Sequence, residues 1–231
     1  MKTLLRAAAI AVASTALVAG GTTAATAAPG DTAAVTGVSL GETATYFSST
    51  PVTGTVSVAG GITSLKATVN VNGVPLPAPV TININASNGV NGFYYDRAWG
   101  NGVVSLTNFI ASGRDAQGFF SNRAVPGPAN SVLIRYAVDT RSSIKVTKRG
   151  KKLTFKLKAR YINNTGGAVG IRKATIQVKK NGTWKTLKNV KLKSNGTGTY
   201  KKSDSKKRNY RLLIKTTSSI QGGNTTGTRK L

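Results

Sequence analysis

The sequence predicts an all-β protein of two β-sandwich domains that follow a cleaved signal peptide. Three observations lead to this prediction. Short segments rich in β-branched residues alternate apolar and polar side chains, which is the period of strands with one buried face. Gly, Asn, Ser and Pro separate these segments at intervals of about ten residues, a spacing typical of sandwiches and barrels. Charge, finally, divides the chain into a neutral first half and a basic second half.

The first 27 residues have the composition of a secretory signal peptide. Lys2 and Arg6 form a short basic start, residues 7–20 are apolar, and residues 25–27 are the small residues of a cleavage site. The apolar stretch is short for a membrane span, and no second one follows. We expect cleavage after Ala27 and a secreted, extracellular chain that is released or retained non-covalently at the cell wall.

The neutral half is expected to form one β-sandwich domain over residues 28–139. Between residues 29 and 139 there are five Lys or Arg and five Asp or Glu. No helical period is present, and the alternating segments predict strands at residues 52–59, 65–71, 80–85 and 131–138.

The basic half is expected to form a second β-sandwich domain over residues 140–231. It contains 26 Lys or Arg and a single acid, Asp204. Residues 153–161 give the clearest strand pattern, because Phe155, Leu157, Ala159 and Tyr161 would share one face while Lys156, Lys158 and Arg160 share the other. Further strands are predicted at residues 174–178, 183–187, 190–193, 199–201 and 210–216.

Asn181 and Gly182 predict a hairpin between two of these strands, since Asn-Gly favours tight turns. A two-residue turn pairs Lys179 with Trp184 and places the Trp on the polar face. A three-residue loop with a bulge pairs Trp184 with Val178 instead. The sequence leaves open whether Trp184 is buried or exposed.

Five segments of the basic half carry a family resemblance, at residues 153–161, 174–178, 181–187, 194–197 and 209–213. Over these last ninety or so residues the chain resembles the bacterial Ig-like repeats of exported actinobacterial proteins. The whole layout is similar to a set of secreted tandem β-sandwich proteins that mostly lack an assigned function. The resemblance implies two Ig-like β-sandwich domains, and it implies little about a biochemical role.

Residue types argue against catalysis, and we expect a protein that is not an enzyme. Histidine and cysteine are absent, which removes the commonest general base, the thiol nucleophile and two common metal ligands. The six acidic residues left after signal-peptide removal are far apart in sequence, so neither a carboxylate pair nor a calcium loop is indicated. We expect no cofactor, no metal and no small-molecule substrate.

The density of positive charge indicates an anionic partner. Strand alternation would turn six cationic side chains outward as neighbours, and cooperating charges hold polyanions. The predicted polyanion-binding residues are Lys156, Lys158, Arg160, Lys179, Lys191 and Lys193. The leading hypothesis is a secreted non-catalytic binding or adhesion module that associates with anionic cell-envelope polymers through its basic domain.

Two other functions fit the same charge. One is sequence-independent nucleic acid binding, in which Tyr161, Trp184, Tyr200 or Tyr210 would stack on bases. The other is a structural spacer without a specific ligand, whose lysines only solubilise strand faces and protect sheet edges. Interspersed charges of both signs would suffice for solubility, so 26 cations beside one acid favour a ligand.

Overall fold

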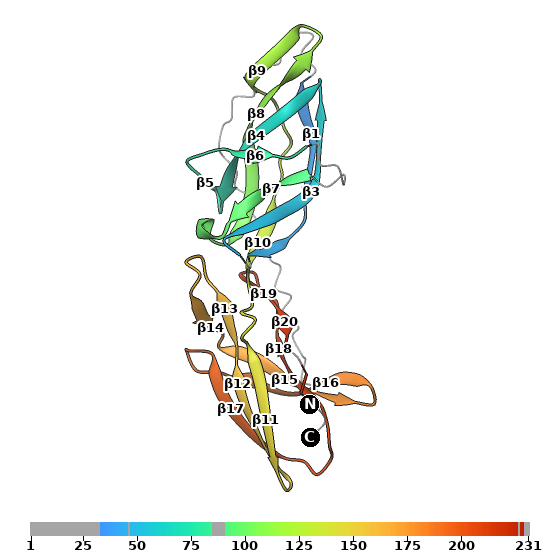
Figure 1. Cartoon of the computed structure of the whole chain (residues 1–231), viewed down its shortest axis with the longest axis vertical. Coiled ribbons are helices and arrows are strands. Elements are labelled where there is room, and N and C mark those ends of the chain that lie inside the picture. The colour runs from blue at the N-terminus through green and yellow to red at the C-terminus, as the bar shows by residue number, and fades with distance from the viewer. Residues whose placement is uncertain (1–32, 46, 85–90, 226, 229–231) are drawn as a thin grey trace, which may run out of the picture.

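The computed structural model describes residues 33–45, 47–84, 91–225 and 227–228. Within these residues every regular element is a β-strand except one 3-10 turn, η1 (Arg97–Trp99). The prediction of an all-β chain is therefore confirmed. The predicted signal peptide and its cleavage after Ala27 lie outside the described residues. Two elongated bodies lie end to end along the long axis, the first built from β1 to β10 and the second mainly from β11 to β20 (Figure 1).

Two sheets build the first body. One is antiparallel and has the order β1 (Ala34–Leu40), β3 (Ser49–Ala59), β7 (Asn91–Asp96). The other follows the path β19-β10-β8-β4-β5, with β2 beside β10, β6 beside β4 and β9 beside β8. Its strands are β2 (Thr43–Thr45), β4 (Ile62–Val71), β5 (Val74–Pro75), β6 (Val80–Ile82), β8 (Gly102–Asp115), β9 (Gly118–Ala124), β10 (Val132–Ala137) and β19 (Ile220–Gln221).

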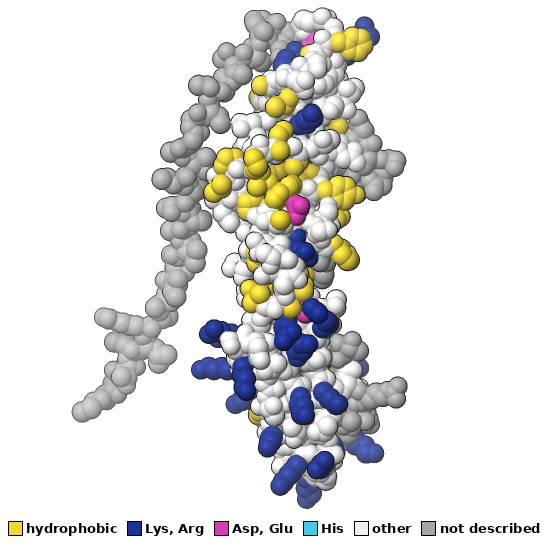
Figure 2. All heavy atoms as spheres, turned by 60° about the vertical axis from the view of Figure 1, so that its left-hand side comes forward, with side chains coloured by type: hydrophobic (Ala, Val, Ile, Leu, Met, Phe, Trp, Pro, Cys, Tyr) yellow, Lys and Arg dark blue, Asp and Glu magenta, His cyan; other side chains and the backbone are white. Residues whose placement is uncertain are grey.

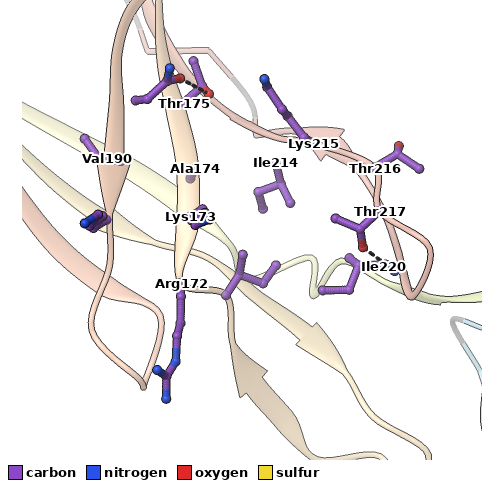
Figure 3. A pocket seen from close by; sticks show the side chains of 13 residues that line it. Arg172, Lys173, Ala174, Thr175, Val190, Ile214, Lys215, Thr216, Thr217 and Ile220 are labelled. Atoms are coloured by element: carbon purple, nitrogen blue, oxygen red, sulfur yellow. Dashed lines mark hydrogen bonds between the residues drawn. The ribbon is translucent and has the colours of Figure 1, made fainter. Parts of the chain in front are cut away.

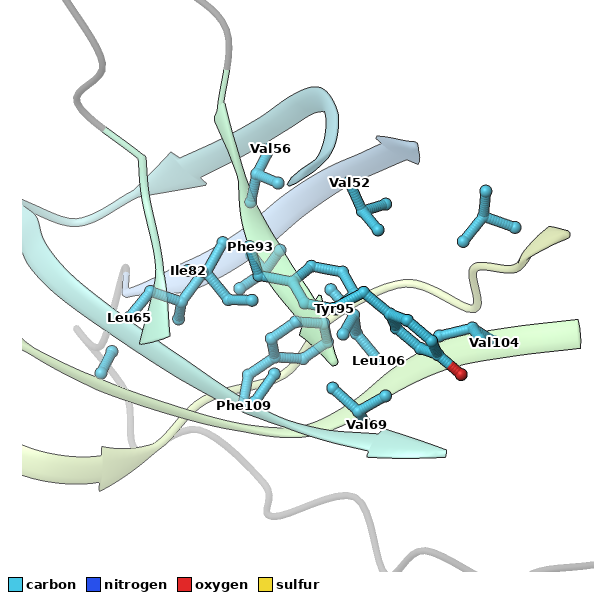
Figure 4. Close-up of a cluster of buried hydrophobic side chains, with 14 of the residues drawn as sticks. Val52, Val56, Leu65, Val69, Ile82, Phe93, Tyr95, Val104, Leu106 and Phe109 are labelled. Atoms are coloured by element: carbon cyan, nitrogen blue, oxygen red, sulfur yellow. The ribbon is translucent and has the colours of Figure 1, made fainter. Parts of the chain in front are cut away.

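The inner faces of these two sheets share a core that draws all its fully buried members from residues 33–134. Phe93 and Tyr95 of β7 point into it, whereas Tyr94 between them is 71% exposed, as strand alternation requires. Tyr95 lies among the buried side chains of this core (Figure 4). Its ring is edge-on to Trp99 at a centroid distance of 5.0 Å. Its burial, together with nearby charge on Tyr136 and Asp96, raises the pKa of the phenol above its usual range.

Three sheets build the second body. The first has the order β11 (Ser143–Arg149), β12 (Lys152–Lys158), β17 (Thr197–Ser203). A two-stranded sheet consists of β13 (Arg160–Ile162) and β14 (Ala168–Gly170). The third has the order β16 (Thr183–Lys191), β15 (Lys173–Lys180), β18 (Tyr210–Ile214), β20 (Gly223–Asn224).

The first and third sheets of this body face each other across a second core, which draws its fully buried members from residues 144–214. Phe155 of β12 is completely buried at its centre. Its ring meets Tyr210 of β18 edge-on at 5.0 Å and lies 5.7 Å from the ring of Tyr200 on β17. Each body therefore has its own hydrophobic core.

The predicted strand over residues 153–161 is wrong at its end, because the chain changes sheets at Ala159. Strand β12 ends at Lys158, and β13 then pairs with β14 instead of β17. The Ala159 N–H donates to the Gly196 carbonyl, and the Ala159 carbonyl accepts from the Ile171 N–H, both at 2.9 Å. The apolar alternation continues through Tyr161 on both sides of this break, so the pattern contained no sign of it.

The Asn181-Gly182 hairpin has the two-residue turn. Both residues have positive φ, 49° and 80°, and Lys179 pairs with Trp184. A bulge follows further along, because Ile176 pairs with Lys188 while Gln177 pairs with Thr186. Strand β16 therefore continues as one strand to Lys191 where two were predicted, at residues 183–187 and 190–193.

The two bodies meet at a hydrogen-bonded junction. Strand β19 belongs to the basic half by sequence, yet it pairs in parallel with Tyr136 and Ala137 of β10. The Tyr136 N–H donates to the Ser219 carbonyl at 2.8 Å, and the Tyr136 ring stacks on Tyr161 of β13 with centroids 5.4 Å apart. The division of charge is therefore not a division of sheets, since the basic half supplies the last strand of the neutral half's larger sheet.

Candidate polyanion-binding surface

The outer face of the β11-β12-β17 sheet is cationic because its strands alternate. Ile144 and Val146 of β11, and Leu153, Phe155 and Leu157 of β12, point into the core. The residues between them must point outward. We call the cations at these outward positions the basic face; they are Lys145, Arg149, Lys152, Lys156, Lys158 and Lys201.

Strand register sets these charges side by side. Lys145 is directly opposite Lys156, and Arg149 is directly opposite Lys152. Opposed side chains on antiparallel strands have Cβ atoms about 5 Å apart, which is within the Debye length of about 8 Å at physiological ionic strength. Like charges placed opposite each other destabilise a sheet. A bound anion would remove this repulsion.

Among the described residues, Asp139 acts on one end of the basic face, where the charge of Lys158 helps to lower the pKa of its carboxyl. The outward positions between the cations are hydroxyl residues: Ser143, Thr147, Thr154, Thr197, Thr199 and Ser203. Asp204 follows β17, and its Oδ2 lies 3.5 Å from Arg208 Nε and 3.9 Å from Lys202 Nζ. Its carboxylate therefore pairs with these two cations at the edge of the sheet. Figure 2 shows the contrast between the cationic second body and the first body, where apolar side chains gather.

The structure divides the six predicted binding residues between two sheets. Lys156 and Lys158 lie on the basic face. Lys179 and Lys191 lie on the β15-β16 hairpin, in the opposing sheet, and Lys191 pairs with Lys173 at the end far from the turn. The outer faces of two sheets that share a core point in opposite directions, so these lysines do not form one surface with Lys156.

The other two predicted residues lie outside both faces. Arg160 follows the break at Ala159, and its Nε donates to the Asn195 carbonyl at 3.3 Å. Lys193 follows β16 in a turn, where its N–H donates to the Thr197 carbonyl. Four cations of the basic face were not among the predicted residues: Lys145, Arg149, Lys152 and Lys201. The alternation of Ile144 and Val146 with polar residues could have identified Lys145, but its pairing with Lys156 depends on register.

The four aromatic residues considered for base stacking are all at least partly buried. Tyr210 is in the core, Tyr200 packs against Phe155, and Tyr161 stacks on Tyr136. Trp184 is half-buried on the outer face of its sheet, and the Arg211 guanidinium lies 4.4 Å above its ring. Arg211 is itself held by Gln177, whose Oε1 accepts from Nε at 2.7 Å.

Among the described residues there is no cluster of three or more His, Cys, Asp or Glu side chains that could hold a metal ion. The same residues contain no helix long and apolar enough to cross a membrane.

Comparisons with known proteins identify no family for this chain. No protein-family model matches the chain. No curated protein matches it either. Among solved structures, a leucine-rich repeat protein from Bacteroides thetaiotaomicron VPI-5482 is similar over 74% of this chain, with 13% sequence identity and a TM-score of 0.16. The chain spans 22% of that protein's length, and a similarity this weak carries no argument about fold or function.

Proposed function

We propose that this chain is a secreted, non-catalytic binding module that holds anionic envelope polymers on the basic face of its second domain. In this proposal a signal peptide of 27 residues is removed. Two Ig-like β-sandwich domains then remain, a neutral one over residues 28–139 and a basic one over residues 140–231. The two separate cores support this division.

The observation that carries the proposal is the register of β11 with β12. It opposes Lys145 to Lys156 and Arg149 to Lys152, with only hydroxyl residues between these cations. Lysines that serve only solubility need no such opposition, because alternating them with acids removes the repulsion. Repeated anions spaced along a polymer would neutralise the rows of cations together.

Affinity would come from many weak contacts acting at once. One exposed ion pair contributes up to about 1 kcal/mol, which is too little to retain a polymer by itself. Several such pairs on one polymer act with a high effective concentration, and each releases counterions that salt can restore. Binding should therefore weaken steeply as salt rises.

The test is retention of the mature protein on purified anionic envelope polymer across a salt series. The variant Lys145→Gln/Lys156→Gln/Lys158→Gln/Lys201→Gln removes four charges from the basic face. Its matched control, Lys179→Gln/Lys180→Gln/Lys185→Gln/Lys188→Gln, removes four from the β15-β16 hairpin, where all four side chains are exposed. We expect the first variant to elute at clearly lower salt than the control.

Three results would overturn the proposal in different ways. Equal loss of retention in both variants would show that net charge binds the polymer and that the basic face has no special part. Equal retention on DNA of matched charge density would remove the preference for envelope polymers and favour nucleic acid binding. A protein retained on neither polymer, even at low salt, would be a spacer.

A further inference from the structure

A groove opens in the second body where two neighbouring strands separate. Strands β15 and β18 are paired from Val178 to Thr175, and the pairing stops at Thr175 opposite Leu213. Beyond this point β15 stays with β16 as far as Lys173, while the chain after β18 turns away toward Ile220 and the junction. The space between them is a cavity of about 680 Å³ (Figure 3). This volume is within the range of natural small-molecule sites, about 300–1,000 Å³.

The floor of this groove is apolar. Ile214 and Ile220 point into the space between the strands (Figure 3). Ile171, Ala174 and Val190 complete the apolar lining. Such a surface binds hydrocarbon because burying apolar area is favourable.

The rim of the groove is cationic. It carries Arg172, Lys173, Lys191 and Lys215, all of them exposed. Lys173 and Lys191 are directly opposed across β15 and β16, and so form a like-charge pair of the kind found twice on the basic face. No acidic side chain lines the groove among the described residues.

The polar side chains of the lining are already engaged with protein groups. Thr175 donates from Oγ1 to Asn189 Oδ1 at 2.7 Å. The Thr216 hydroxyl accepts from the Gly222 N–H at 3.1 Å, and the Thr217 hydroxyl accepts from the Ile220 N–H at 3.0 Å. The side-chain groups that remain for a ligand are therefore the four cations, the Asn189 amide nitrogen and the apolar floor.

We propose that this groove binds a free amphiphilic anion, namely a carboxylate, sulfonate or phosphate head on a single apolar chain. Each part of the site binds one part of the ligand, because the cations of the rim pair with the anionic head and the apolar floor packs against the hydrocarbon chain. A purely ionic polymer leaves the floor unused. The site is separate from the basic face, which lies on the opposing sheet, so either proposal can fail without the other.

The experiment is calorimetric titration of the full chain with dodecanoate, below the concentration at which it forms micelles. We expect one saturable site. Dodecyltrimethylammonium, which has the same chain and the opposite charge, and acetate, which has the charge without the chain, should not bind. The variant Lys173→Gln/Lys191→Gln should weaken dodecanoate binding by roughly three- to tenfold, because it removes up to two exposed ion pairs.

Control variants separate this groove from the rest of the surface. Lys179→Gln/Lys188→Gln removes the same charge from the same hairpin outside the groove and should leave dodecanoate binding within about twofold of wild type. The fourfold basic-face variant should do the same. Ala174→Leu fills the floor and should weaken binding without changing charge; the charge variant gives the answer if this one fails to fold.

Equal binding of the cationic amphiphile would overturn the proposal. So would dodecanoate affinity that is unchanged in Lys173→Gln/Lys191→Gln.

Discussion

Asp139 lies where the neutral half passes into the basic half, and its side chain is only 3% exposed. The carboxylate accepts from the Arg141 N–H at 2.9 Å and from Arg141 Nε at 3.0 Å, while the Asp139 N–H donates to the Arg160 carbonyl. Burial, the largest single influence, raises the pKa of this carboxyl. The hydrogen bonds and the charge of Arg141, together with the charge of Lys158, outweigh it, so the pKa lies below its ordinary value of 3.8.

The lowered pKa predicts how stability changes with pH. A carboxylate of this kind stabilises the folded state above its ordinary pKa, and the contribution is lost as the pH falls through the lowered value. We expect Asp139→Asn to reduce the free energy of unfolding at neutral pH by about 1–3 kcal/mol. The difference in free energy of unfolding between Asp139→Asn and the wild type should become smaller at pH values below 3.8.

Urea unfolding at neutral pH and in acid measures this difference. Glu42→Gln is the control, because its carboxylate is 59% exposed although it bonds Arg135 at 2.6 Å. Glu42→Gln should reduce the free energy of unfolding by less than about 1 kcal/mol. A gap for Asp139→Asn that is the same at both pH values would show that the charge of Asp139 contributes nothing.

The sequence predicts which lysines of a strand point outward, but it does not predict which of them lie next to one another on the folded surface. The alternation of Phe155 and Leu157 with Lys156 and Lys158 follows from the two-residue period of a strand, and the structure has it. Which lysine lies opposite Lys156 depends on the pairing of β11 with β12, which no local pattern specifies. The partition of Lys156 and Lys179 between opposing sheets likewise depends on contacts far apart in sequence.

Strand boundaries were predicted well where turn residues mark them and poorly where a strand changes partner. Asn181 and Gly182 mark the hairpin, and both adopt the positive φ that their residue types favour. At Ala159 no turn residue is present. The change of partner coincides with the close approach of Gly196, on which a Cβ would collide with the Ala159 carbonyl.

Replacement by alanine should reduce the free energy of unfolding by different amounts at Gly182 and at Gly196. Gly182 has a φ of 80° and open space around it, so Gly182→Ala should cost only the backbone strain, about 1–2 kcal/mol. Gly196 has a φ of 78° and backbone atoms in the way, so Gly196→Ala should cost more than about 3 kcal/mol.

Thermal and urea unfolding of the two alanine variants give this comparison directly. Similar losses in both would mean that Ala159 and Gly196 separate easily. The change of sheet at Ala159 would then not depend on their close approach.

At the scale of the whole molecule, the two tryptophans report on the two bodies separately. Trp99 packs against the first core, and Trp184 lies on the third sheet of the second body. Tyr136 belongs to β10 of the first body, but its ring stacks on Tyr161 of the second. We expect Tyr136→Ala to lower the free energy of unfolding reported by Trp184 by about 0.5–1.5 kcal/mol, the contribution of the lost ring pair.

This prediction is measured with a Trp99→Phe background, so that Trp184 alone gives the fluorescence. Tyr94→Ala is the matched control, because Tyr94 is also on the first body but is 71% exposed. It should leave the Trp184 transition unchanged. A Trp184 transition insensitive to Tyr136→Ala would show that the bodies unfold independently of the stacked rings.

Charge composition divides the chain near Asp139, but it gives no indication of how the two bodies are joined. The neutral and basic stretches meet near Asp139, and the two cores lie on either side of it. Nothing in residues 217–221 indicates that they return to the first body, because two residues of β19 are too few to show a strand period. The groove could not be predicted for the same reason, because it forms where the chain after Ile214 separates from β15 on its way back to the first body.

The pairing of β19 with β10 also fixes an order in which the protein is completed as it is made. N-terminal units of a nascent chain fold first, so the core of residues 33–134 can form while the basic half is still being synthesised. The end of β10 at Tyr136 and Ala137 must then wait for Ile220 and Gln221. Until these two residues pair with it, the end of β10 offers an open strand edge to neighbouring chains, and their pairing removes that route to aggregation.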